Sequence, residues 1–185
     1  QVTVFRATVP RAGEQIKFDF KEQTAVDKQT AKKWKELNIA PSDLCSDEVF
    51  IRRVYLDVTG TLPDAKDVLT FLDDKDPAKR DKLVDRLVET PEYAYYFANK
   101  WADILRVKRR NQADRATGTF GFHNWIREAM ATDKPYDEFA REILAATGDQ
   151  IKSPPTVWYL ELTQPENFVD DTAQVFLGLR MACAQ

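Results

Sequence analysis

The sequence predicts an all-α fold, an irregular antiparallel helical bundle of about seven to eight helices with a short N-terminal β segment. From about residue 25 onward, apolar residues recur at spacings of three and four, the period of a helix with one buried face. Capping residues followed by acids or by proline recur along the same stretch. The segments between these helix starts are short, and short connections favour antiparallel neighbours.

Residues 1–22 have a different pattern from the rest of the chain. Apolar and polar residues alternate from Val2 to Val9, and the stretch from Pro10 to Gly13 predicts a turn before the apolar residues of 16–20. A hairpin of this size is marginally stable alone, so we expect it to complete a β-domain that lies upstream. Residues 25–185 are then expected to form the helical domain, which the sequence leaves incomplete at its C-terminal end.

Four of the predicted helices begin at a capping signal. Ser46 and Asp64 precede acidic first turns, whereas Asp76 and Thr90 precede a proline at the first helical position, where its missing N–H costs nothing. Gly60 marks a helix end. The helices are expected at residues 27–38, 46–58, 64–73, 77–89, 91–107, 120–132 and 135–147, with an eighth from about 170 to the end.

Composition excludes several classes of function. The chain has 185 residues, 43% of them hydrophobic, which suits one globular domain with a sizeable core. Its formal net charge of −3 does not favour a polyanion, so nucleic acid is not an expected partner. The longest apolar run falls short of the roughly 18 residues that a membrane span needs. The chain begins without methionine or a signal peptide, so we expect a fragment of a longer polypeptide.

Metal and acid–base chemistry have little support in the residues. Two cysteines, Cys45 and Cys183, and a single histidine are too few for a disulfide framework or a four-ligand zinc site. The carboxylates fall at helix starts and on polar faces, and the adjacent pair Asp170–Asp171 is expected to be solvated. Arg53 and Asp57, one helical turn apart, are expected to form a semi-buried ion pair with a structural role.

One basic cluster stands out, at the end of the predicted helix over residues 91–107. It contains Arg106, Lys108, Arg109 and Arg110. Cations near a helix C-terminus stabilise the helix dipole, which explains part of the cluster without any ligand. The alternative is a surface that binds an anionic substrate or partner.

His123 is the only histidine and lies at the start of the helix expected over residues 120–132. Its ring is suited to a lone base or an axial haem ligand, but a structural or capping role is the simpler interpretation.

Residues 148–169 carry three prolines and are expected to form an ordered loop with at most a short helix. Trp158 and Tyr159 lie within this segment. Most aromatic residues of the chain fall at helical spacing and are expected in the core, whereas two aromatics in a loop are candidates for a pocket wall or a partner surface. Trp158 is therefore a candidate binding residue.

The end of the chain matches part of a haem-attachment motif. An apolar helical pattern leads into Cys183-Ala184-Gln185, which one more cysteine and a histidine would complete to Cys-x-x-Cys-His, the c-type haem motif. The alternative interpretation is a buried cysteine on the last helix, because Phe176, Leu179 and Cys183 are spaced three and four apart.

Several segments together resemble one known family. This set is similar to the cytochrome-associated domain family of unknown function that is abundant in planctomycete-type bacteria, and the resemblance covers residues 25–185. Residues 1–20 resemble instead the tail of a bacterial immunoglobulin-like domain. The segments that carry the family resemblance are Asp47–Pro63, Lys82–Tyr93, Trp101–Asp103, His123–Ile126, Lys134–Phe139 and Thr172–Gly178.

In that family the last helix commonly continues as Cys-Ala-Gln-Cys-His. The resemblance therefore implies an exported multidomain protein, periplasmic or at the cell surface, with a covalently attached c-type haem and Cys183 as the first attachment cysteine. The iron also needs the histidine of the motif, so haem c is expected in the full-length protein and is not assigned within these residues. Neighbouring domains of the same polypeptide and a redox partner protein are the expected partners.

Two classes of function remain open. The first is a helical domain that supports a haem site for electron transfer or oxidation. The alternative is a non-catalytic interaction or scaffold module of a cell-surface or secreted protein, with the cluster around Arg109 and the Trp158 segment as contact surfaces. Neither interpretation specifies a reaction, so whether the protein is an enzyme stays open.

Overall fold

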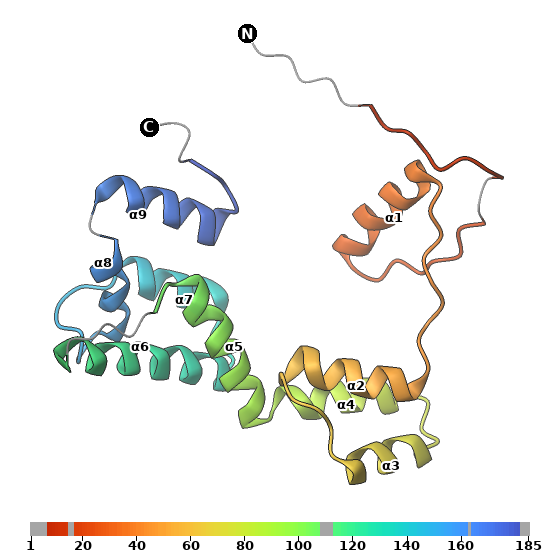
Figure 1. Cartoon of the computed structure of the whole chain (residues 1–185), viewed down its shortest axis with the longest axis horizontal. Coiled ribbons are helices and arrows are strands. Elements are labelled where there is room, and N and C mark those ends of the chain that lie inside the picture. Colours follow the sequence, from red (N-terminus) through yellow and green to blue (C-terminus); the bar gives the residue numbers. More distant parts are fainter. Residues whose placement is uncertain (1–6, 15–16, 108–112, 163, 182–185) are drawn as a thin grey trace. The chain divides into compact units, whose positions relative to one another are not determined.

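The computed structural model describes residues 7–14, 17–107, 113–162 and 164–181, and within these ranges the chain is all-helical (Figure 1). The all-α prediction is confirmed. The chain divides into two compact units, Gln1–Ser46 and Asp47–Gln185. The helices are α1 (Ala25–Leu37), α2 (Asp47–Val58), α3 (Ala65–Asp73), α4 (Lys79–Val88), α5 (Pro91–Ile104), α6 (Ala113–Ala131), α7 (Tyr136–Leu144), α8 (Val157–Glu161) and α9 (Pro165–Thr172), with a 3₁₀ turn η1 (Pro154–Thr156) and a π-helical turn η2 (Ala173–Leu177).

The predicted N-terminal β segment is not supported, because residues 7–14 and 17–24 carry neither helix nor strand. Residues 1–6 and 15–16 lie outside the described residues. The polar groups of this segment are partly satisfied by the end of α1 instead of by a second strand. Asn38, just after α1, donates its side-chain amide to the carbonyl oxygens of Arg11 and Glu14, at 3.2 Å each.

The first unit is built around α1. Thr24 and Asp27 form a capping box, in which each side chain accepts a hydrogen bond from the backbone N–H of the other residue. Phe18 and Phe20 pack against Trp34, with ring centroids 6.3 and 5.4 Å away. This small aromatic cluster explains why the chain before α1 is ordered against the helix without pairing as a strand.

The second unit contains two hydrophobic cores. The first lies between α2, α3 and α4, and its buried residues recur at helical spacing. The second lies among α5 to α9, and Figure 1 shows α5 leading from the first group of helices to the second. The buried residues of the first core are Ile51, Val54, Tyr55, Phe71, Leu83 and Leu87. Those of the second are Ala98, Leu105, Phe122, Ile126, Ala129, Phe139, Ile143, Val157, Trp158 and Leu162.

One carboxylate, that of Asp47, holds the ends of three helices in the first core. Asp47 begins α2 and accepts bonds from Nε and Nη2 of Arg80, at 2.8 and 2.6 Å. It also pairs at 2.7 Å with Lys79, which begins α4. The same ammonium of Lys79 donates to the carbonyl oxygens of Phe71 and Asp74 at the end of α3. These bonds satisfy carbonyls that a helix end leaves without an internal partner.

The ion pair predicted between Arg53 and Asp57 is wrong. Both side chains are exposed and no ion pair joins them. The buried face of α2 is formed by Ile51, Val54 and Tyr55. At about 100° per residue, positions 53 and 57 point away from that face, so they meet solvent rather than a neighbouring helix.

Gly60 lets the chain turn sharply between α2 and α3. Its φ of +71° lies in the left-handed region, which a side chain disfavours. The ring of Tyr96 from α5 lies against it, so that a Cβ at this position would sit 2.6 Å from Cε2 of Tyr96. The turn after α2 thus forms a close contact between the first core and α5.

α5 and α6 pack side by side in the second core. The buried face of α5 carries Ala94, Ala98 and Ala102, whose small side chains at spacings of four allow a close approach. α6 begins at Ala113, earlier than the predicted start at residue 120. Gly118 lies inside the helix, where a Cβ would sit 2.9 Å from Cδ of Gln150 and 3.1 Å from Cγ2 of Val157, so tertiary packing accounts for a glycine that locally suggests a break.

The proline-rich segment folds into short helices. Pro154 and Pro155 open η1, which leads directly into α8, in agreement with a loop that holds at most a short helix. The last helix begins at Pro165 instead of residue 170, with proline at its first position. After Thr172 the winding becomes π-helical and ends at Gly178, whose φ is +66°.

We expect Gly60→Ala to destabilise the protein strongly. A left-handed alanine costs about 1–2 kcal/mol, and the added methyl group also meets the ring of Tyr96. Urea unfolding followed by circular dichroism measures the loss.

Two glycine variants serve as controls. Gly148 has a φ of +94° but open space around it, so Gly148→Ala reports backbone strain alone. Gly121→Ala, inside α6 with nothing within 4 Å, should be neutral or should stabilise by up to about 1 kcal/mol. If Gly60→Ala costs no more than Gly148→Ala, the contact with Tyr96 contributes nothing.

We expect Asp47→Asn to lower stability in a pH-dependent way. Hydrogen bonds from Lys79 and then Arg80 hold the pKa of Asp47 below its ordinary value. The unfolded chain therefore binds this proton more tightly than the folded chain. The difference between wild type and variant should be complete above about pH 5 and should shrink as the pH falls below about 4. Thermal melting from pH 3 to pH 7 checks this, with exposed Asp57→Asn as the matched control variant.

Candidate functional site

Two of the segments that carry the family resemblance meet at one hollow of about 420 Å³. Its walls come from the end of α2, the turn into α3, the inner side of α4 and the start of α5. The turn into α3 and the start of α5 are held by local caps. Asp64 accepts the backbone N–H of Asp67 at 2.7 Å, and Thr90 accepts that of Tyr93 at 3.4 Å. The residues that line the hollow are Tyr55, Thr59, Thr61, Leu62, Asp64, Asp67, Arg86, Leu87, Thr90 and Glu92.

A cluster of three polar side chains lies beside this hollow. The hydroxyl of Tyr55 donates to Oδ2 of Asp67, and Nη2 of Arg86 donates to the same hydroxyl at 3.3 Å. Arg86 and Asp67 are 3.8 Å apart. Since Tyr55 belongs to the buried face of α2, it contributes its ring to the first core and its hydroxyl to the cluster. The core therefore fixes the position of the phenol oxygen.

Tyr55 acts as a hydrogen-bond donor in this cluster. Burial raises the pKa of Tyr55 to about 12, and the bond to the Asp67 carboxylate contributes in the same direction. The phenol is then protonated throughout the neutral range and is not suited to act as a base. The arrangement satisfies one oxygen of Asp67 and orients its carboxylate toward Arg86.

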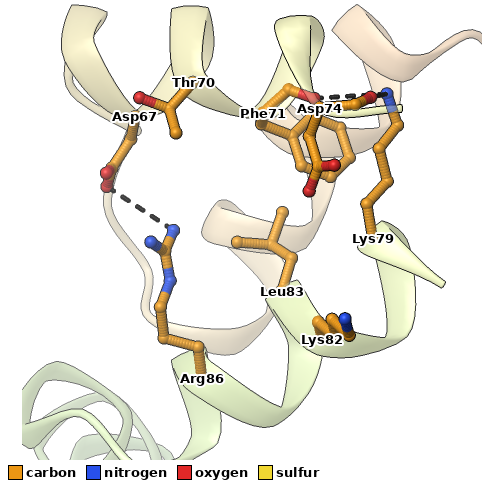
Figure 2. A pocket seen from close by; sticks show the side chains of 8 residues that line it. All are labelled: Asp67, Thr70, Phe71, Asp74, Lys79, Lys82, Leu83 and Arg86. Atoms are coloured by element: carbon orange, nitrogen blue, oxygen red, sulfur yellow. Dashed lines mark hydrogen bonds and ion pairs between the residues drawn. The ribbon is translucent and has the colours of Figure 1, made fainter. Parts of the chain in front are cut away.

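A second, smaller hollow of about 160 Å³ lies on the other side of the Asp67–Arg86 pair (Figure 2). Phe71 and Leu83 form its apolar part, between an α3 wall with Asp67, Thr70 and Asp74 and an α4 wall with Lys79, Lys82 and Arg86. Two of these cations are already paired. Lys79 bonds Asp47, and Lys82 lies 2.5 Å from Asp76, which raises the pKa of Lys82 and lowers that of Asp76. Arg86 lines both hollows.

The chain near its C-terminal end is held by two neighbouring carboxylates on α9. Asp171 is only 5% exposed and pairs at 2.6 Å with Arg106, which follows α5 in a left-handed conformation. Asp170 accepts the backbone N–H of Met181 at 3.1 Å. The prediction that this pair is solvated is wrong for Asp171, because α9 turns that side chain toward the buried side of the domain.

The structure places the predicted binding residues in different environments. Arg106 is the ion-pair partner of Asp171, which gives it a structural role. His123 lies within α6 and not at its start, and its Nε2 is 2.9 Å from Oδ1 of Asn99 on α5. Trp158 is 1% exposed and packs against Phe168, so it is not a partner surface as predicted. The remaining candidates, Lys108, Arg109, Arg110 and Cys183, lie outside the described residues.

Trp158 is buried because α8 carries it under the last helix. Its ring contacts those of Phe168 and Phe176, eight residues apart on one side of the α9–η2 segment. Local sequence shows two aromatics among prolines and does not show which helix covers them. The indole N–H of Trp158, Oδ2 of Asp171 and Oγ1 of Thr172 are buried and have no hydrogen-bond partner in the described part of the chain.

Sequence reasoning missed Tyr55, Asp67 and Arg86. A signal was available, since Tyr55 and Arg86 lie inside two segments of the family resemblance and Asp67 lies in the capping turn between them. Tyr55 and Arg86 do not cap a helix. Asp67 lies in the first turn of α3, after the cap Asp64. Such polar residues within a motif, left over once caps and core are assigned, indicate a cluster.

The described residues contain neither a helix that could span a membrane nor a cluster of metal-binding side chains. No helix within the described ranges is long and apolar enough to span a membrane. The described side chains also contain no group of three or more His, Cys, Asp or Glu that could hold a metal ion.

The fold and its polar cluster define a small all-helical domain in which helix ends, rather than a sheet edge or a cofactor-binding loop, build the hollows. The family described as PSCyt2, a protein of unknown function (DUF1549), matches residues 25–185, and the chain belongs to this family. The match covers the residues over which the resemblance was expected. No curated protein and no solved structure matches the chain.

We expect Tyr55→Phe to destabilise the protein by about 1–3 kcal/mol, because the lost hydrogen bond has a charged acceptor. The folded-state pKa of Tyr55 is raised, so its contribution is complete below about pH 10 and is lost as the pH rises toward about 12. Denaturant unfolding at pH 8 and pH 11 measures both effects. Exposed Tyr136→Phe is the control, and an equal loss in the two variants would contradict the role of the Asp67 bond.

Proposed function

We propose that this chain is the helical domain of an exported, multidomain, cytochrome-type protein and that Cys183 is the first attachment cysteine of a c-type haem. The family name and the Cys-Ala-Gln ending support the proposal. The observation that carries it furthest is the exposed apolar segment that leads to Cys183.

That segment runs from Leu177, the last residue of the π-helical turn, to Met181. Leu177, Leu179 and Met181 are 67%, 55% and 42% exposed, although apolar side chains of this size are usually buried. The backbone N–H of Met181 is held by Asp170, so the segment is tied to α9 two residues before Cys183. A haem macrocycle is largely apolar, and side chains of this kind suit its edge.

The described residues fit one part of a haem site and not the whole. They present the approach to Cys183, but His123 is bonded to Asn99 and we assign it no axial role. The second cysteine and the proximal histidine of the motif would follow Gln185. A haem bound there would supply one-electron chemistry. The chain's own contribution is to hold the segment in place through Asp170 and to hold α9 against the end of α5 through Asp171 and Arg106.

The test uses the full-length protein with its natural continuation after Gln185, purified from a host that has haem-maturation machinery. We expect a Soret band and haem that stays attached under denaturing conditions. Cys183→Ala should abolish the attachment or leave a single thioether, seen as a shifted haemochrome band. Cys45→Ala, the matched cysteine control, should leave the spectrum unchanged. Wild-type protein without covalent haem, or an unchanged haemochrome in Cys183→Ala, overturns the proposal.

The second candidate function is a non-catalytic interaction or scaffold module. It is favoured by the polar hollows on both sides of Arg86, which are formed by side chains that the core and the helix caps hold in place. In this case the contact surface is the first core's polar cluster rather than the buried Trp158. Full-length protein that lacks a Soret band and still binds a ligand at Arg86 would decide for this alternative.

A further inference from the structure

The distances from Arg86 to Asp67 and Tyr55 are longer than is usual for an arginine beside a carboxylate. Charge-assisted N–H···O bonds to carboxylates are about 2.7–2.9 Å long, whereas Arg86 and Asp67 are 3.8 Å apart. Its hydrogen bond to the Tyr55 hydroxyl, at 3.3 Å, is also long. The side chain is 54% exposed, and its other N–H groups meet no acceptor among the described residues. Arg86 therefore has donors that remain available at the two hollows that it lines.

The charges around the larger hollow restrict what can bind there. Its lining includes the carboxylates of Asp64, Asp67 and Glu92 and the single guanidinium of Arg86. Three negative charges against one positive charge repel phosphate, polyanions and simple carboxylates. A simple amine would be attracted by the carboxylates but would meet the like charge of Arg86. A molecule that carries both an ammonium and a carboxylate matches both signs.

The apolar parts of the hollow suggest what else the ligand carries. Leu87 lines the hollow and is buried, whereas Leu62, at the turn after α2, also lines it and is 62% exposed. An aliphatic group that covered Leu62 would remove apolar surface from water. The volume of about 420 Å³ lies in the range of small-molecule sites. The smaller hollow of Figure 2 is a weaker candidate, because Lys79 and Lys82 already have carboxylate partners.

The structure is also organised before any ligand arrives. Tyr55 donates to Asp67 and so holds that carboxylate in one orientation beside Arg86. The hydroxyls of Thr59 and Thr61 are hydrogen-bonded to each other at 2.8 Å, next to the left-handed Gly60. A preorganised site loses less conformational freedom on binding.

We propose that this hollow binds a small zwitterion of the α-amino acid class with an aliphatic side chain. The ligand carboxylate pairs with Arg86 through the arginine fork, the ammonium faces Asp64 and Glu92, and the side chain covers Leu62. The proposal is independent of the haem proposal, since it involves only residues of the first core and the start of α5.

The experiment is calorimetric titration of the whole protein with L-leucine as the probe. Two analogues test the charge argument. Isocaproate is the same molecule without the ammonium, and isoamylamine is the same molecule without the carboxylate. We expect saturable binding of L-leucine and binding at least about tenfold weaker for each analogue, the effect of losing one charge-assisted pair. No saturable binding of L-leucine, or equal binding of either analogue, overturns the proposal.

Variants locate the binding. Arg86→Gln and Glu92→Gln should each weaken L-leucine binding by about tenfold or more while circular dichroism shows a folded protein. The matched control is Arg141→Gln, which removes an exposed cation paired with Asp137 on α7 and should leave the affinity unchanged. Glu92 makes no hydrogen bond within the described structure, so its variant stays informative if Arg86→Gln fails to fold. Unchanged affinity in Glu92→Gln, or an equal loss in Arg141→Gln, contradicts the assignment.

Discussion

The carboxylate of Asp47 is the contact on which the first core depends. It lies at the start of α2 and binds Arg80 and Lys79 at the start of α4, and Lys79 reaches on to the last carbonyls of α3. Three helix ends thus share one set of charges. Hydrophobic burial selects the face that each helix turns inward. The directional bonds of Asp47 and Lys79 then hold the ends of α2, α3 and α4 together.

The polar cluster is a consequence of that arrangement. With the three helices fixed, Tyr55 extends from the buried face of α2 toward α3 and meets Asp67, while Arg86 on α4 reaches the same hydroxyl. The cluster is therefore part of the packing and part of a surface at once. Its looseness at Arg86 distinguishes it from the Asp47 contacts, which are short and satisfied. The short contacts hold helix ends together, and the long one is the observation behind the proposed amino-acid site.

In the second unit's other core, two contacts of α9 hold the segment that leads to Met181. Arg106 and Asp171 join the end of α5 to α9, and Asp170 holds Met181. Breaking the first of these pairs would leave a buried charge without its partner, which is costly, so α9 is kept in one position. The exposed side chains of Leu177, Leu179 and Met181 lie on the segment held in this way. Family membership and this geometry together motivate the haem proposal.

The sequence by itself determined the all-α class and most helix starts, because these depend on neighbours a few residues apart. The caps Asp64 and Thr90 act within one turn, and the spacing of Ile51, Val54 and Tyr55 is a local property of one helix. Only the tertiary structure decided which polar residues meet. Asp47 and Arg80 are 33 residues apart and Arg106 and Asp171 are 65 apart, so no local pattern pairs them. The start of α6 and the burial of Trp158 were decided in the same way, since Gly118 packs against Gln150 and Val157 and the last helix covers Trp158. Caps and periodicity are short-range effects of the backbone, whereas the partners of a charge or a ring depend on how whole helices pack.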